Sequence, residues 1–118
     1  MKYVCLVYGE EKDLFALSPE GATKLDADSL AYDRSLDQQG KLIIAQALQP
    51  VKTSKSVRRR KGKQLVTDGP FAETKEQLLG FVMIEAASLD EALAIAGNIP
   101  LAELGTIEVR AIYTIPGS

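Results

Sequence analysis

The chain contains no histidine and a single cysteine, Cys5. Without histidine it cannot hold a Ser-His-Asp or Cys-His nucleophile system, a histidine-ligated zinc or a histidine proton shuttle. A single cysteine excludes an intrachain disulfide and any multi-cysteine zinc or iron–sulfur site. Any acid–base chemistry would therefore depend on carboxylates, tyrosine, lysine or Cys5, and we expect no metal and no cofactor.

Strong charge of one sign is also lacking. The chain has 14 Lys and Arg against 16 Asp and Glu, a net charge of −2, so its overall field does not favour nucleic acid or an anionic membrane. The apolar run at residues 3–8 is too short for a signal peptide core or a membrane span. Together with the lone cysteine, this predicts a cytoplasmic protein.

The size and composition are those of one folded domain. A chain of 118 residues with 46% apolar and 25% charged side chains lies near the globular average and needs no disulfide or metal to fold. We find no linker, repeat or low-complexity tract, so residues 1–118 are expected to form a single domain.

Hydrophobic patterning predicts the order of the elements. In the first half we expect a strand at 3–8, followed over 19–39 by one broken helix or two short ones that end at Gly40. A strand at 42–45 comes next, and then a hairpin whose strands, 56–60 and 63–67, are joined by a turn at Lys61–Gly62. In the second half we expect a strand at 78–84, a helix that opens with the Ser88–Glu91 capping box and is ended by Pro100, and a strand at 106–115.

Without the hairpin, this order is strand, helix, strand, strand, helix, strand. It predicts an α+β, ferredoxin-like βαββαβ antiparallel sheet with an inserted β-hairpin and both helices on one face. The strands are apolar at successive positions, so their second face also needs burial. We expect a homodimer that packs sheet against sheet; the alternative is that the hairpin folds over part of that face.

The longest distinctive string runs from Val66 to Phe81 and contains Asp68-Gly69-Pro70-Phe71. It resembles the signature of the bacterial YCII-related proteins of the DGPF type. Flanking features agree with this resemblance: Tyr8-Gly9, the segment from Leu89 to Leu93, and the segment from Ile107 to Arg110. The likeness covers nearly the whole chain.

The resemblance implies a dimeric α/β barrel with a pocket between the sheet and the partner. Some relatives are fused to, or encoded beside, extracytoplasmic-function sigma factors. YCII-like relatives are regarded as enzymes with a His-Asp pair, of which only the Asp68 half can be carried over here. Leu79 stands where the family has glycine, and Ala111 where it has proline.

Asp68 is the leading candidate for chemistry. Its carboxylate would face the pocket as a general acid or base with a pKa raised by partial burial. The structural alternative is a turn or a helix cap. The usual Asx turn is blocked because the residue two positions on is Pro70, which has no N–H, but a cap that accepts from the Phe71 amide stays open.

The other candidates are substrate-binding residues. Arg110 could clamp an anionic substrate or pair with Glu85 or Asp68. Tyr8 could offer its phenol to the same cleft or simply pack. Phe71 is interpreted as core rather than as a stacking platform, and Glu73 as solvated, with each also a candidate for lining the pocket.

Two further features carry less weight. Cys5 lies mid-strand and is interpreted as an inert small hydrophobe. The basic run from Lys55 to Lys63 has no interleaved aromatics and points to both hairpin faces, so nucleic-acid binding is not expected.

Three functions compete. The first is a cofactor-free isomerase or lyase that uses Asp68 as proton shuttle and Arg110 to orient a small anion. The second is a non-catalytic ligand-binding or regulatory module linked to sigma-factor circuits. The third is polyanion binding through the basic run.

Overall fold

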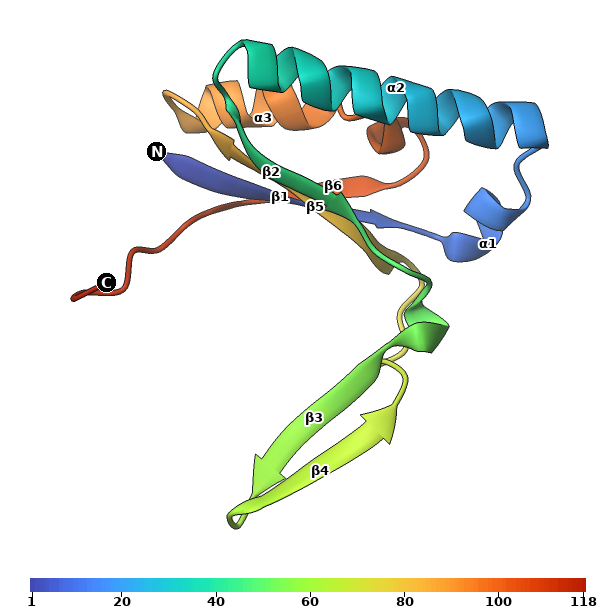
Figure 1. The fold of residues 1–118 in the computed structure, drawn as a ribbon, viewed down its shortest axis with the longest axis vertical. Helices are drawn as coiled ribbons and strands as arrows, with labels where there is room; N and C mark the ends of the chain where they lie inside the picture. The colour runs from blue at the N-terminus through green and yellow to red at the C-terminus, as the bar shows by residue number, and fades with distance from the viewer.

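The computed structural model describes all residues, 1–118 (Figure 1). In chain order its elements are β1 (Lys2–Gly9), α1 (Glu11–Phe15), α2 (Pro19–Gln38), β2 (Leu42–Ala47), the 3-10 turn η1 (Val51–Thr53), β3 (Lys55–Arg60), β4 (Lys63–Asp68), β5 (Gln77–Glu85), α3 (Leu89–Gly97), η2 (Pro100–Glu103) and β6 (Thr106–Ala111).

Four strands form one antiparallel sheet in the order β2-β5-β1-β6. The long helix α2 and the shorter α3 cover the same face of this sheet (Figure 1). This is the ferredoxin-like arrangement with an inserted hairpin, the fold class of the dimeric α/β barrels, as the sequence predicted. Whether two copies of this chain associate stays a prediction.

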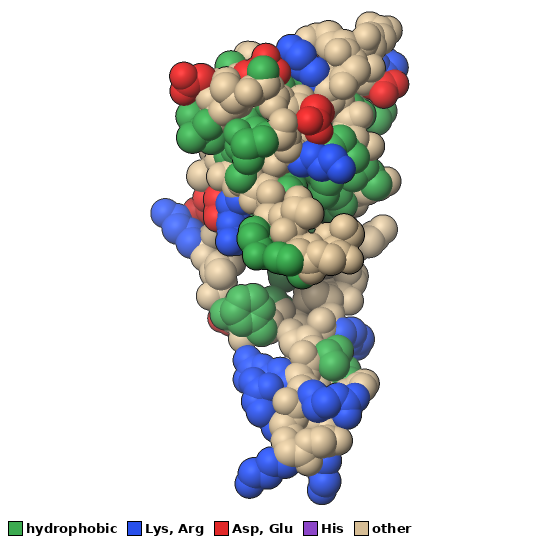
Figure 2. Space-filling model, turned by 90° about the vertical axis from the view of Figure 1, so that its left-hand side faces the viewer, with side chains coloured by type: hydrophobic (Ala, Val, Ile, Leu, Met, Phe, Trp, Pro, Cys, Tyr) green, Lys and Arg blue, Asp and Glu red, His purple; other side chains and the backbone are tan.

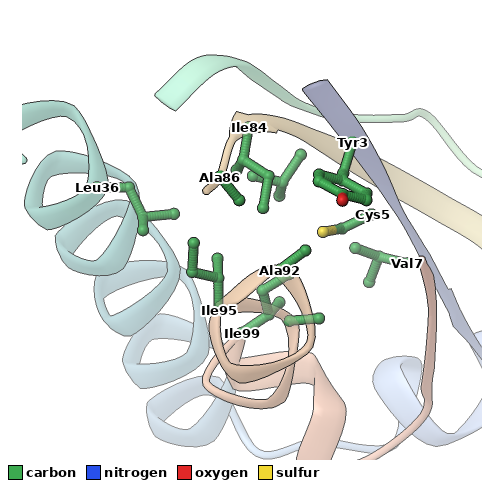
Figure 3. Packing of buried hydrophobic residues seen from close by; sticks show 11 residues of the cluster. Tyr3, Cys5, Val7, Leu36, Ile84, Ala86, Ala92, Ile95 and Ile99 are labelled. Carbon is green, nitrogen blue, oxygen red and sulfur yellow. The ribbon is translucent and has the colours of Figure 1, made fainter. Parts of the chain in front are cut away.

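The core lies between the sheet and the two helices. Alternate residues of β1, Tyr3, Cys5 and Val7, point toward it and are buried. Figure 3 shows them facing Ile84 of β5 and the side chains of α3. The Tyr32 hydroxyl donates a 2.7 Å hydrogen bond to the Ile95 carbonyl, which ties α2 to α3 across this core.

The helix over residues 19–38 is unbroken, so the expected break is absent. Ser18 caps it by accepting from the Gly21 amide at 3.0 Å, and Pro19 occupies its first turn, where a missing N–H costs nothing. No proline follows inside it. Gly40, with φ of +72°, lies just past the end, as predicted.

The start of α3 forms the first bond of the predicted capping box, but the second bond reaches the amide of Ala87 instead of that of Ser88. The Ser88 hydroxyl accepts from the Glu91 amide at 3.2 Å, and the Glu91 carboxylate accepts from the Ala87 amide at 3.3 Å. The end differs from the prediction, because α3 stops at Gly97 and Pro100 instead opens η2.

The last strand is shorter than predicted. It ends at Ala111 rather than at residue 115. The amide of Ile112 still donates to the Lys2 carbonyl at 2.9 Å, but β1 begins at Lys2, so the following residues have no neighbouring strand to pair with. The short helix α1 was not predicted.

The inserted hairpin, residues 55–68, is called the arm below. It turns at Lys61 and Gly62, which both have positive φ (51° and 76°), as a two-residue hairpin turn requires. The arm forms a sheet of its own and projects away from the rest of the molecule, called the body (Figure 1). The alternative in which it folds over its own open sheet face is therefore wrong.

The sheet face opposite the helices is open and apolar at its centre. Val4, Leu6, Phe81 and Met83 lie there half-buried, because their neighbours in each strand point into the core. No helix is both long enough and apolar enough to span a membrane.

Candidate functional site

A cleft lies on the helix-covered side of the sheet, between α2 and the edge strand β2. It measures about 570 Å³. A smaller pocket of about 100 Å³ continues from it toward the core, and the two share Ser29, Asp33, Ala45, Gln46, Ala47, Leu79 and Leu101. We call the two together the cleft.

One wall of the cleft is a face of α2, and the opposite wall is the edge strand β2. Near the end of α2, Leu36 is buried against the core. Earlier in the helix, Leu25, Ser29 and Asp33 follow each other at intervals of four residues, so they share one face, and this face lines the cleft. The opposing strand presents small residues, Ala45 and Ala47, which leave room for a ligand.

The helix α1 holds one end of this cavity in place. The Glu11 amide donates to the Gln77 side chain at 2.8 Å, and the Glu11 carboxylate accepts from the Val51 amide at 2.9 Å. Because these bonds join α1 to β5 and η1, the apolar side chains of Leu14 and Phe15 are held at the cleft wall.

Asp33 is the one ionisable residue that lines both parts of the cleft. Its surroundings are mostly aliphatic, and it makes no hydrogen bond or ion pair within the chain. Burial raises the pKa of the Asp33 carboxyl above its usual range, because the charged form is poorly solvated there. A carboxyl with a raised pKa in a cleft is a typical acid–base group.

The cleft has an acidic character. Glu11 and Asp26 line it together with Asp33, and no Lys or Arg contributes to its wall. No three acidic or cysteine side chains are grouped as metal ligands.

Asp68, the predicted proton shuttle, lies outside this cleft. It ends β4 at the base of the arm, its side chain is 88% exposed, and its carboxylate is hydrogen-bonded and ion-paired to Lys55 on β3. The helix-cap alternative is wrong, since no helix begins in residues 69–76.

The rest of the motif forms the loop that follows the arm. Gly69 has φ of +86°, its amide donates to the Ser54 carbonyl at 2.8 Å, and its carbonyl accepts from the Ser56 hydroxyl at 2.8 Å. These bonds close the base of the arm. Phe71 is 81% exposed, so its assignment to the core is wrong: the loop leaves the sheet here, and nothing packs over the ring.

Glu73 is exposed in this loop, as expected, and makes no ion pair. Neighbouring residues give the loop its shape: the Gln77 side chain donates to the Thr74 carbonyl at 2.7 Å, and Lys75 pairs with Glu10 at 3.8 Å.

Tyr8 and Arg110 lie on the open sheet face, on the other side of the sheet from the cleft. Arg110 is paired in register with Val4, and Tyr8 with Thr106. Neither expected salt bridge forms: Glu85 is paired with the amino terminus at 3.1 Å, and Asp68 is paired with Lys55. The predicted site residues are thus divided among the arm, its loop and the open face, and none of them lines the cleft.

Cys5 is fully buried, and burial raises its pKa to about 11. The thiol therefore stays protonated at physiological pH, which fits the expected inert hydrophobe.

Sequence reasoning did not single out Ser29 and Asp33. The available signal was two polar residues four apart in the stripe that Leu25 begins and Leu36 ends, where a purely structural helix would continue with apolar side chains.

Comparison with known proteins agrees with this fold. The chain is 41% identical over 114 residues to an uncharacterised protein of Rhizobium meliloti (strain 1021), a match that covers 95% of this chain and 92% of the relative. A solved structure with a similar fold is 5-chloro-2-hydroxyhydroquinone dehydrochlorinase from Burkholderia phenoliruptrix AC1100, in complex with 2,5-dihydroxybenzoquinone. Its TM-score is 0.58 at 17% identity, and the match covers 96% of this chain and 94% of that one. The YCII-related domain matches residues 1–116, and the chain belongs to this family.

Proposed function

We propose that this YCII-related protein binds a small, largely apolar molecule in the cleft between α2 and β2 and transfers a proton to or from it through Asp33. The reaction class is that of a cofactor-free isomerase or lyase. The observation that carries the proposal is the Asp33 carboxyl, which has no partner in the chain and a pKa raised by its apolar surroundings.

The chemistry of the wall supports this class of ligand. Aliphatic side chains would cover the faces of a flat ring, while Ser29 supplies a hydroxyl group beside Asp33. A carboxyl with a raised pKa can hold a proton nearer neutral pH than an ordinary one, so it can act as an acid and, once ionised, as a stronger base.

The dehydrochlorinase that shares the fold was solved with a dihydroxybenzoquinone. At 17% identity this likeness concerns the fold alone. It nevertheless supplies a first set of probes for this chain, namely quinones and hydroquinones with ring hydroxyl groups.

Asp68 and Arg110 keep their predicted roles, as acid–base group and anion clamp, as part of the same proposal. In a single chain neither lies in the cleft. Asp68 would enter a cleft only on the arm strand of a second copy, and we propose a cytoplasmic homodimer in which the open faces around Val4, Leu6, Phe81 and Met83 pack together. In such a pair Arg110, which lies beside Val4 on the open face, would act as an anion clamp between the two sheets and not in the cleft. A closed twofold pair of this kind would bury their exposed apolar surface.

The test compares Asp33→Asn with wild-type protein. Binding of 2,5-dihydroxybenzoquinone and of substituted hydroquinones is measured by ligand-observed NMR, and turnover by ultraviolet absorbance. We expect the variant to keep binding and to lose turnover by about 10²–10⁴-fold, the usual contribution of an acid–base group. Asp26→Asn, which removes an exposed carboxylate at the rim of the cleft, is the matched control and should keep both.

Two results would change the conclusion. If wild-type protein binds but shows no turnover, and Asp33→Asn alters only affinity, the protein is a ligand-binding or regulatory module of the kind linked to sigma-factor circuits. If Asp33→Asn matches the wild type in both assays while Asp68→Asn does not, the acid–base group is Asp68 and our assignment of the cleft is wrong.

A further inference from the structure

Charge is divided unevenly between the arm and the body. The arm, residues 55–68, holds six of the 14 Lys and Arg residues and one of the 16 Asp and Glu residues. Its net charge is therefore +5, and that of the body is −7. In Figure 2 the basic side chains gather on the lower, projecting part of the molecule, and the acidic side chains lie on the body above it. Opposite charge on two separate parts of one chain favours contact between two copies.

The arm also exposes apolar side chains. Val57 and Val66 are direct cross-strand partners, so they lie on one face, and they are 62% and 54% exposed. The same face carries the neighbouring pairs Lys55–Asp68 and Arg59–Gln64. We call these six residues the valine face.

The valine face has no covering element in its own chain. The two strands of the arm pair with each other, and neither packs substantially against another strand or helix. A two-stranded hairpin standing alone in water is only marginally stable. Its apolar pair therefore needs a partner surface.

The cleft is complementary to the valine face in its apolar surface and in its charge. It is lined mainly by aliphatic residues, and its charged side chains are Glu11, Asp26 and Asp33, with no Lys or Arg. The apolar pair is flanked by Arg59 and by the Lys55–Asp68 ion pair, so the valine face has a net charge of +1 and matches such a surface in hydrophobicity and in the sign of its charge. The arm points away from its own body (Figure 1), so its own cleft is not the one it meets.

We propose that the valine face of one copy docks on the rim of the cleft of a second copy, reciprocally, around a twofold axis. Docking covers Val57 and Val66, closes one side of the partner's cleft and brings Arg59 and the Lys55–Asp68 pair to its acidic rim. Each cleft is then completed by the other chain, and Asp68 joins a site that its own chain does not build. The inference depends on the shape and charge of the two surfaces and holds whether or not the cleft is catalytic.

Cross-linking between two singly substituted full-length proteins tests this geometry. Val57→Cys, with a mass tag, is mixed with untagged Leu30→Cys, which places a thiol at the rim of the cleft, and the mixture is oxidised mildly. The native Cys5 is fully buried and does not interfere. We expect the mixed disulfide to form at least tenfold faster than with Arg58→Cys, whose side chain lies on the opposite face of the arm.

Hydrogen exchange gives a second readout that needs no new cysteine. In wild-type protein the amides of the arm should be protected at high protein concentration and lose that protection on dilution. The double variant Val57→Glu, Val66→Glu should lose it at every concentration while the amides of β1 and β5 stay protected, which shows that the body is still folded.

Three results would overturn the proposal. One is equal cross-linking by the Val57→Cys and Arg58→Cys proteins, which would mean that the arm has no preferred face. Another is protection of the arm that does not depend on concentration. The third is salt-sensitive binding of heparin or an oligonucleotide by an arm that stays unprotected, which would make the arm a polyanion-binding element instead.

Discussion

The Tyr32 hydroxyl donates a hydrogen bond of 2.7 Å to the carbonyl of Ile95, from one helix of the layer to the other. Tyr32 also lines the smaller part of the cleft, one residue before Asp33. The bond therefore fixes the position of α2 where that helix carries its acid–base candidate, and it links the packing of the core to the geometry of the cleft.

Removing this hydroxyl should destabilise the protein modestly. For Tyr32→Phe we expect a loss of about 1 kcal/mol in the free energy of unfolding, the net contribution of one hydrogen bond. The Ile95 carbonyl keeps a second donor in the Asn98 amide, at 3.2 Å, so the cost stays small. Urea unfolding measures it. Tyr113→Phe, at a 76% exposed side chain with no hydrogen bond, is the control and should match the wild type.

Two glycines should respond in opposite ways to substitution by alanine. At Gly80 a Cβ would lie 2.6 Å from the Gln46 carbonyl oxygen and 3.1 Å from Ala47 Cα, both backbone atoms of β2. We expect Gly80→Ala to cost about 1–3 kcal/mol because β2 must shift. At Gly97 a Cβ meets nothing within 4 Å, so Gly97→Ala should add about 0.5–1 kcal/mol. Equal melting temperatures for the two variants would contradict the close approach of β2 to β5.

Stability should depend on pH through Asp33. Because its pKa is higher in the folded protein than in the unfolded chain, the folded state holds the proton more tightly. The resulting stabilisation is fully present below the unfolded pKa, about 4, and is lost as pH rises through the folded pKa. Asp33→Asn removes this term, so the variant should gain stability relative to the wild type between pH 3 and pH 7.

Denaturant unfolding at both pH values measures the difference between the two proteins. Asp37→Asn is the control. It removes one negative charge from the same helix at an exposed position outside the cleft. An Asp33→Asn curve parallel to that of the wild type would show that Asp33 is solvated as an ordinary surface carboxylate.

Much of the fold could be predicted because local signals agreed with tertiary packing. Ser18 and Pro19 mark the start of α2, and Gly40 follows its C-terminal end. Lys61 and Gly62 form the hairpin turn of the arm. The length of β6 could not be read from its own sequence, since residues 112–115 continue the apolar pattern. Where that strand stops depends on the start of β1, which is distant in sequence.

The candidate site was less predictable than the fold. The motif around Asp68 is distinctive in sequence, yet in a single chain it shapes the base of the arm and the loop beyond it. The cleft depends instead on how α1 and α2 are placed beside the small residues of β2. Such a void results from the relative placement of three elements, and no local pattern in any one of them reports it.

The arm contributes almost nothing to the core that holds the body together. Substitutions on the surface of the arm should therefore change the free energy of unfolding of the body very little. The length and the charges of the arm can then diverge faster in evolution than the residues of the sheet. If the arm docks on a second copy as proposed, such divergence would decide which of several related chains recognise each other, and new pairings would arise without any change in the fold.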